Sequence, residues 1–183
     1  MDTNYFQQII DEETTQAERL ASILIDMYSP KTVADYGCAT GLYLGPFAAQ
    51  GIEVNGYDNS DAALALTKLP GKVHKADLTQ PQSFDATDLS ICLEVLEHIE
   101  AEDAIKCAET IASKSNILVF SAAHPGQGGE GHINCRPKEY WEGVFNTHGL
   151  WVDQADTERV VSFMASGYHM GWLPMNLMVF KKR

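Results

Sequence analysis

Apolar residues recur at helical spacing in the first part of the chain. Within residues 3–28 the apolar positions are Leu20, Ile23, Leu24 and Met27, and the acidic residues expected on other faces are Glu12, Glu13 and Glu18. Ser29 precedes Pro30, and a residue before proline is disfavoured in a helix, so this helix should end there. We therefore expect residues 1–30 to form a helical cap on the rest of the chain.

Short apolar blocks and amphipathic segments alternate through the remainder. Strands are expected at residues 32–36, 52–57, 72–76, 88–93, 116–121, 150–152 and 176–181. Helices are expected at residues 42–50, 60–69, from the Glu94 segment to about residue 113, and at 137–148, where the apolar side carries Tyr140, Trp141, Val144 and Phe145. This alternation predicts an α/β fold in a single domain, residues 1–183, with a mostly parallel sheet and helices on both faces.

The stretch from Asp35 to Leu42 links the first strand to the next helix through Gly37 and Gly41. A glycine lets a ligand approach the backbone closely, and the free N–H groups that open a helix face such a ligand. Ligands bind at the carboxyl ends of strands in sheets of this kind. The stretch therefore predicts a nucleotide cradle.

Two kinds of nucleotide site fit this stretch poorly. A nucleoside triphosphate loop requires Lys and Ser or Thr after the last glycine, but Leu42 and Tyr43 follow Gly41. A dinucleotide fingerprint requires glycine at position 39 and a small residue at position 42, where the chain has Ala39 and Leu42.

The pattern Asp35-x-Gly37-x-Ala39-x-Gly41, with acidic residues after the second and third strands, resembles the class I S-adenosylmethionine-dependent methyltransferases, in particular the small, ubiquinone-pathway-like domains. The resemblance covers residues 32–180, and Ala39 replaces the middle glycine of the family pattern. It implies a Rossmann-like sandwich with a mostly parallel seven-stranded sheet. Residues 32–183 would then form the catalytic core, and S-adenosylmethionine would be the cofactor, released as S-adenosylhomocysteine.

The resemblance also implies roles for individual residues. Asp58 would accept the ribose hydroxyls, and Asp77 the adenine amino group, with Leu78 beside the ring; alone, Asp58 could be a helix cap and Asp77 a turn residue. The implied cofactor-binding residues are Asp35, Gly37, Cys38, Gly41, Asp58, Asn59, Asp77, Leu78, Glu94 and Val95.

Methyl transfer from a sulfonium requires mainly positioning, plus a base when the acceptor is weakly acidic. We predict that His132 is this base and that His124 is the second choice, because both follow the fifth strand. The alternative is that His132 only fixes its loop through the backbone. The glycine-rich residues 125–131 before it could be a lid or a surface connection.

A divalent cation is an alternative at the Glu94 segment. Glu94, Glu97 and His98 would share one helical face and, with His132, could hold a metal, as in the ubiquinone-pathway and small-RNA ribose methyltransferases that the segment resembles. Many relatives carry a similar segment without a metal, and we predict none here.

Charge narrows the choice of partners. The formal net charge is −12, which disfavours nucleic acid and anionic lipid surfaces and favours a small neutral or cationic substrate. The four scattered cysteines and the lack of a signal peptide or apolar span predict a cytoplasmic protein with reduced thiols and no membrane partner. The aromatic and methionine cluster in residues 160–174 fits substrate recognition, packing or a homodimer surface; it contains Phe163, Met164, Tyr168, His169, Met170 and Trp172.

We therefore predict an enzyme that methylates an oxygen, or as second choice a nitrogen, of a small molecule or sugar. The alternatives are a metal-assisted RNA ribose 2′-O-methyltransferase and a non-catalytic S-adenosylmethionine-binding protein. No Asn-Pro-Pro-Tyr or Asp-Pro-Pro-Tyr segment follows the fourth strand, where Leu93 to Leu96 lie instead, so methylation of DNA amino groups is disfavoured.

Overall fold

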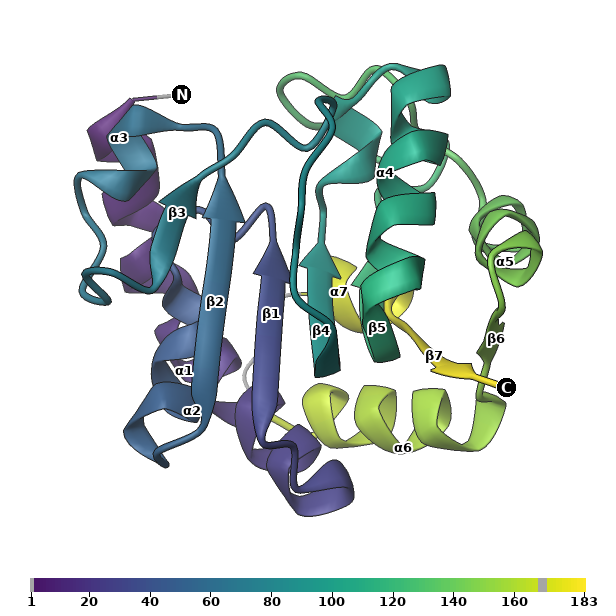
Figure 1. Cartoon of the computed structure of the whole chain (residues 1–183), viewed down its shortest axis with the longest axis horizontal. Coiled ribbons are helices and arrows are strands. Elements are labelled where there is room, and N and C mark those ends of the chain that lie inside the picture. Colours follow the sequence, from purple (N-terminus) through teal and green to yellow (C-terminus); the bar gives the residue numbers. More distant parts are fainter. Residues whose placement is uncertain (1, 168–170) are drawn as a thin grey trace.

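A seven-stranded sheet lies between two layers of helices in the computed structural model, which describes residues 2–167 and 171–183 (Figure 1). The strands are β1 Thr32–Tyr36, β2 Glu53–Asp58, β3 Val73–Lys75, β4 Thr87–Leu93, β5 Ser115–Ser121, β6 Leu150–Val152 and β7 Met178–Lys182. All seven predicted strands are present within about two residues, and the predicted α/β sandwich is confirmed.

The strand order is β3-β2-β1-β4-β5-β7-β6. Strands β1 to β5 pair in parallel, whereas β7 runs antiparallel to both of its neighbours. The chain order reverses between β1 and β4, and ligands bind at the carboxyl ends of strands beside such a switch point. In Figure 1 the arrowheads of β1, β2 and β4 point to this edge.

Two apolar cores flank the sheet, because successive strand residues point to opposite faces. On β5, Leu118 and Phe120 enter one core and Val119 enters the other. One core is covered by α4 Ala101–Lys114 and α5 Lys138–Thr147, and the predicted apolar side of α5 faces it. The other core is covered by α1 Thr3–Tyr28, α2 Gly45–Ala49, α6 Gln154–Ala165 and α7 Trp172–Asn176.

The helix predicted at residues 60–69 is shorter in the structure. It is α3 Asp61–Leu64, and only Ala63 in this segment is buried. After Leu64 the backbone N–H groups of Leu66 and Thr67 donate to carbonyl oxygens three residues back, so the α-helical hydrogen bonding ends there, and Leu69 packs against the core from outside the helix.

The C-terminal part contains two helices that the sequence did not predict, α6 and α7. Asp153 caps α6 by accepting from the backbone N–H of Asp156, and Val160 and Met164 bury its inner face. Part of the cluster in residues 160–174 is therefore packing; Tyr168, His169 and Met170 lie outside the described residues. None of the described helices is long and apolar enough to cross a membrane.

The segment from Glu94 to His98 differs most from its prediction. Glu94 has a left-handed backbone with φ of 52°, a short 3-10 turn η2 Leu96–His98 follows, and Ile99 is extended before α4 begins at Ala101. The prediction that Glu94, Glu97 and His98 share one helical face is therefore wrong, because the chain turns sharply at the end of β4.

Candidate active site

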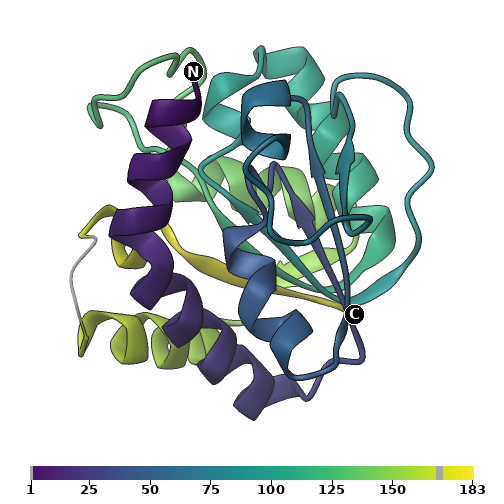
Figure 2. The same cartoon turned by 90° about the vertical axis from the view of Figure 1, so that its left-hand side faces the viewer.

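A cavity of about 810 Å³ opens at the carboxyl ends of β1, β2 and β4. Its walls come from the first turns of α1, the turn after β1, the ends of β2 and β3, the Glu94 segment, residues 127–130 and Trp172. Figure 2 shows α1 along one side of the molecule, with its first turns near the loop that follows β5. The volume is within the usual range for a cofactor or drug-sized ligand.

The turn after β1 requires glycine at position 37. Gly37 has φ of 79°, and a Cβ there would lie 2.4 Å from Cγ2 of Val95. The N–H groups of Gly37 and Cys38 both donate to the carbonyl oxygen of Tyr57, at 2.8 and 3.2 Å. The turn is thus held against β2 and the Glu94 segment, and Gly37, Cys38 and Val95 all line the cavity.

Gly41, the second glycine of this stretch, lies outside the first cavity. It lines a second cavity of about 760 Å³ between α1 and α2, and a Cβ on it would lie 2.8 Å from Cγ2 of Val73. Close packing beside β3 therefore explains why position 41 is a glycine. The resemblance implied that Gly41 binds the cofactor, but Gly41 does not line the first cavity.

Asp58, the last residue of β2, organises this side of the cavity. Its Oδ2 accepts from the N–H of Ala39 and its Oδ1 from the N–H of Ser60, both at 2.8 Å. Ser60, rather than Asp58, caps α3. A carboxylate offers about four acceptor positions, so Asp58 keeps two for the hydroxyls of a ligand.

Asp77 is both a turn residue and a cavity residue. Its Oδ1 accepts from the N–H and from the hydroxyl of Thr79, at 2.9 and 2.7 Å, which shapes the turn after β3. No donor among the described residues reaches Oδ2. Asp77, Leu78 and Asn59 all line the cavity, so Oδ2 is available to a ligand amino group.

Asp35 lies at the base of the cavity with 4% of its surface exposed. Burial, and secondarily the carboxylate of Asp58, raises the pKa of Asp35 to about 8. A cationic ligand nearby would favour the ionised form of this carboxyl group.

Two cavity-lining residues, Glu13 and Tyr43, were not predicted from the sequence. Glu13 of α1, predicted to lie off the buried face, is only 9% exposed, and its Oε2 accepts from the hydroxyl of Tyr43 at 2.9 Å. Burial raises the pKa of Glu13. Both residues line the cavity. The helical period alone could not show that Tyr43 would supply a partner for an inward carboxylate.

Glu94 also lines the cavity, at the tip of β4. Its carboxylate accepts from Gln127 Nε2 at 3.1 Å and from Asn176 Nδ2 at 3.1 Å. Gln127 belongs to the glycine-rich loop that the sequence analysis singled out, whereas Asn176 was not predicted as a site residue. Nothing in the local sequence pattern connects Asn176 with residue 94.

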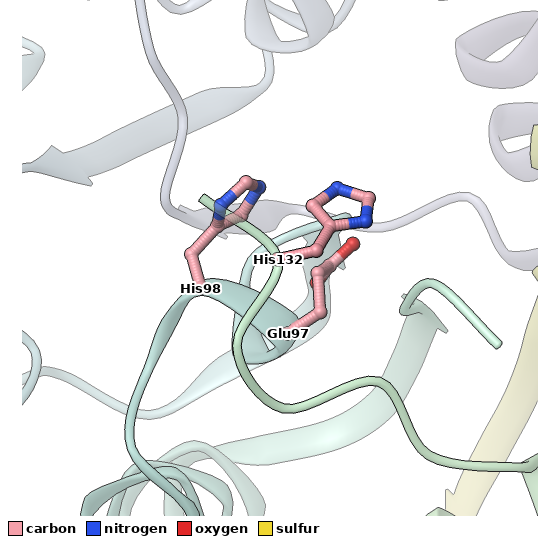
Figure 3. Close-up of side chains that lie close together, drawn as sticks. All are labelled: Glu97, His98 and His132. Carbon is pink, nitrogen blue, oxygen red and sulfur yellow. The ribbon is translucent and has the colours of Figure 1, made fainter. Parts of the chain in front are cut away.

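Glu97, His98 and His132 form a compact cluster (Figure 3), in which one ligand atom from each lies within 4.8 Å of the others. Burial, and secondarily Glu94, raises the pKa of Glu97 to about 8. Its Oε1 accepts from the N–H of Ala123 at 3.0 Å, whereas Oε2 has no donor among the described residues. A proton on Glu97, or a cation, would satisfy this buried oxygen.

Burial and the neighbouring His132 lower the pKa of His98, which favours its neutral form. The centres of the two imidazole rings lie 4.8 Å apart, edge to face. Three of the four candidate metal ligands are thus brought together, while Glu94 contacts Gln127 and Asn176. The described geometry is compatible with a cation but does not require one.

The two predicted bases, His132 and His124, differ in their position relative to the cavity. His132 lines the cavity, its Nδ1 is buried without a partner among the described residues, and Gly129 packs so closely that a Cβ there would lie 2.3 Å from the ring. His124 does not line the cavity, and its Nδ1 lies 2.9 Å from the carbonyl oxygen of Pro125. Of the two predicted bases, only His132 faces the cavity.

Comparisons with known proteins show the family and the fold of the chain. Residues 12–157 match a family described as a methyltransferase domain. A ubiquinone biosynthesis O-methyltransferase of Rickettsia felis is 37% identical over 172 residues, which cover 90% of this chain and 59% of that protein. The chain spans about half the length of the curated relatives it matches.

Two solved structures share the fold. An amino pentose methyltransferase from Micromonospora echinaspora, solved with S-adenosylmethionine bound, superposes with a TM-score of 0.67 at 17% identity, covering 94% of this chain and 91% of that one. A sugar N-methyltransferase from Streptoalloteichus superposes with a TM-score of 0.72 at 14% identity, covering 100% of this chain and 93% of that one.

Proposed function

The chain belongs to the methyltransferase-domain family, and we propose that it transfers a methyl group from S-adenosylmethionine to an oxygen, or as second choice a nitrogen, of a small molecule or sugar. The observation that carries the proposal is the convergence of Asp35, Asp58 and Asp77 on one cavity beside the Gly37 turn. We also propose that residues 1–183 act as one domain, with α1 as its cap.

The residues present fit S-adenosylmethionine. Asp58 keeps two acceptor positions for the ribose, Asp77 Oδ2 can accept from the adenine amino group, and Asp35 lies at the base of the cavity, where a cation would favour its ionised form. The cofactor supplies a methyl group that its positive sulfur already activates. The remaining chemistry is positioning of the acceptor and acceptance of a proton.

We propose His132 as the residue that takes this proton. The cofactor would supply the methyl group to the acceptor oxygen and leave as S-adenosylhomocysteine, and the imidazole of His132 would accept the proton of the acceptor. His132 is suited to this role because it faces the cavity, whereas His124 does not.

The charge of the cavity supports a neutral or cationic acceptor. The acidic residues in its lining are Glu12, Glu13, Asp35, Asp58, Asp77, Glu94 and Glu130. None of the described lining residues is Lys or Arg. A phosphate backbone would meet repulsion here, so RNA is disfavoured as a substrate.

Calorimetry with S-adenosylhomocysteine tests the cofactor site. The wild-type protein should bind it, and Asp58→Ala should weaken binding about tenfold to a hundredfold, as expected for loss of hydrogen bonds to a charged group. Asp61→Ala is the matched control, because Asp61 is exposed, does not line the cavity and forms an ion pair with Lys75. Absence of binding by the wild-type protein would contradict the proposal.

Formation of S-adenosylhomocysteine with a panel of small hydroxyl and amine acceptors then separates an enzyme from a binding protein. An RNA gel shift tests the ribose methyltransferase alternative. Turnover of a hydroxyl compound but not its amine analogue would support oxygen as the accepting atom, and the reverse result would favour nitrogen.

Metal-assisted methyl transfer is the second candidate, and the cluster of Glu97, His98 and His132 favours it. Imidazole and carboxylate together suit several divalent cations, which could polarise an acceptor hydroxyl in place of a general base. Elemental analysis of the purified protein and turnover after chelation test this candidate. Loss of turnover that returns with added divalent cation would support it, and full turnover after chelation would contradict it.

A further inference from the structure

Asn176 lies at the same edge of the sheet as the candidate active site, although it is 82 residues from Glu94. It is the last residue of α7, two positions before β7 begins, and Met178 pairs with Phe120 near the carboxyl end of β5. Because β7 is antiparallel, its first residues lie where the parallel strands end. The topology thus brings Asn176 to the cavity edge.

The side-chain nitrogen of Asn176 lies near three oxygen atoms, which belong to two residues. This nitrogen, Nδ2, lies 3.1 and 3.4 Å from the two carboxylate oxygens of Glu94 and 2.8 Å from Oε1 of Gln127. Gln127 Nε2 in turn donates to Glu94 Oε2 at 3.1 Å. An amide nitrogen has two hydrogens, so one can serve Gln127 while the other is shared by the carboxylate. The three side chains form a closed triangle.

This triangle holds two parts of the site that would otherwise be poorly fixed. Glu94 has a left-handed backbone, which is unfavourable for a residue with a Cβ and persists only when surrounding contacts impose it. Gln127 lies in a glycine-rich loop whose backbone has little intrinsic preference. Asn176 is only 2% exposed and ends a helix packed on the core, so it provides a rigid partner for both.

The side chain of Asn176 is not needed to end its own helix. The N–H of Leu177 already donates to the carbonyl oxygen of Leu173 at 2.9 Å. The amide instead points to two cavity-lining residues on other elements.

We propose that Asn176 is a positioning residue of the methyl-transfer site: it orients the carboxylate of Glu94 and, through Gln127, holds residues 125–131 over the part of the cavity beside His132, where the acceptor is proposed to bind. The catalytic part of this inference rests on the proposed function. The triangle itself can be tested without any ligand.

Hydrogen–deuterium exchange of residues 125–131 in the ligand-free protein tests the triangle. Asn176→Ala should raise exchange of this loop about tenfold, because a hydrogen bond to a charged group is lost. Asn176→Asp should raise it further, since two carboxylates would then face each other. Met175→Ala is the matched control: Met175 is in the same helix but 60% exposed, and should leave the loop unchanged.

A reciprocal exchange provides the decisive rescue. In the double variant Glu94→Gln with Asn176→Asp, the amide introduced at position 94 can donate to the carboxylate introduced at position 176. Loop exchange should return to within about threefold of wild type. If Asn176→Ala leaves exchange unchanged, or the double variant exchanges as fast as Asn176→Asp alone, the proposal is wrong. Gln127→Ala, in the loop itself, gives the same test if the core variants fail to fold.

Turnover of an acceptor found with the wild-type protein tests the catalytic part. Asn176→Ala should lower kcat/KM for the acceptor at least tenfold, whereas its affinity for S-adenosylhomocysteine should change less than threefold. A loss of cofactor affinity equal to the loss of kcat/KM would overturn the positioning role. A wild-type protein that binds no S-adenosylhomocysteine would instead refute the proposed function, while loop exchange would still decide the triangle.

Discussion

The two sides of the cavity are built in different ways. On the side proposed to hold the cofactor, Gly37, Asp58 and Asp77 each lie at or just after the end of one of three consecutive strands, β1, β2 and β3. On the side proposed to hold the acceptor, Glu94, Gln127 and Asn176 come from three distant parts of the chain and meet through side-chain hydrogen bonds.

The difference shows how far a sequence pattern can specify a site. Parallel strands place their carboxyl ends at one edge, so residues at these ends converge whatever the details of packing. The acceptor side depends in addition on an antiparallel strand, a left-handed residue and a loop. We therefore expect the cofactor side to be sensitive to backbone changes and the acceptor side to changes of individual side chains.

The largest effect is expected from Gly37→Ala. A Cβ would lie 2.4 Å from Val95 and would also face an unfavourable φ of 79°. Together these effects should lower the free energy of unfolding by about 2–5 kcal/mol and abolish measurable binding of S-adenosylhomocysteine. Chemical denaturation and calorimetry measure both quantities.

Gly51→Ala is the matched control for this prediction. Gly51 has φ of 77°, but a Cβ on it would meet nothing within 4 Å. It should therefore show only the backbone cost, about 1–2 kcal/mol, with cofactor binding intact. Equal losses in the two variants would show that the contact with Val95 does not matter.

His132→Ala tests the acceptor side. If His132 is the general base, kcat should fall about a hundredfold to ten thousandfold. His148→Ala is the control, because His148 ends α5 and does not line the cavity. If the turnover of His132→Ala equals that of the wild-type protein at every pH, His132 is not the general base.

Burial of Asp35 should make the stability of the protein depend on pH. Its pKa is raised from 3.8 to about 8 by burial, so between these values the folded protein holds a proton that the unfolded chain has released. Stability from this group is complete below pH 3.8 and is lost as pH rises toward 8, at about 1.4 kcal/mol per pH unit in the middle of the window.

Asp35→Asn should remove this slope. Subtracting the free energy of unfolding of the variant from that of the wild type at each pH isolates the contribution of Asp35. A difference that stays constant between pH 4.5 and 7.5 would contradict the raised pKa. S-adenosylhomocysteine affinity measured on the same samples shows whether the carboxylate also serves the cofactor.

Much of the fold could be predicted because strand periodicity and turn residues are local signals. The seven strands and the ends of β1, β2 and β3 follow from them. The end of helix α3 and the segment at Glu94 were predicted wrongly, because helical propensity there is overridden by the turn after Leu64 and by the sharp turn after β4. Glu13 was placed outside because its partner Tyr43 is 30 residues away.

The sequence by itself determined the α/β order and the acidic residues at strand ends that surround the Gly37 turn, because short-range periodicity and parallel topology suffice for these. Only the tertiary structure decided that Gly41 packs beside β3, that Glu97, His98 and His132 form one cluster, and that Asn176 reaches Glu94. These contacts depend on antiparallel β7, on a left-handed backbone and on close packing between distant segments, none of which has a local signal in the chain.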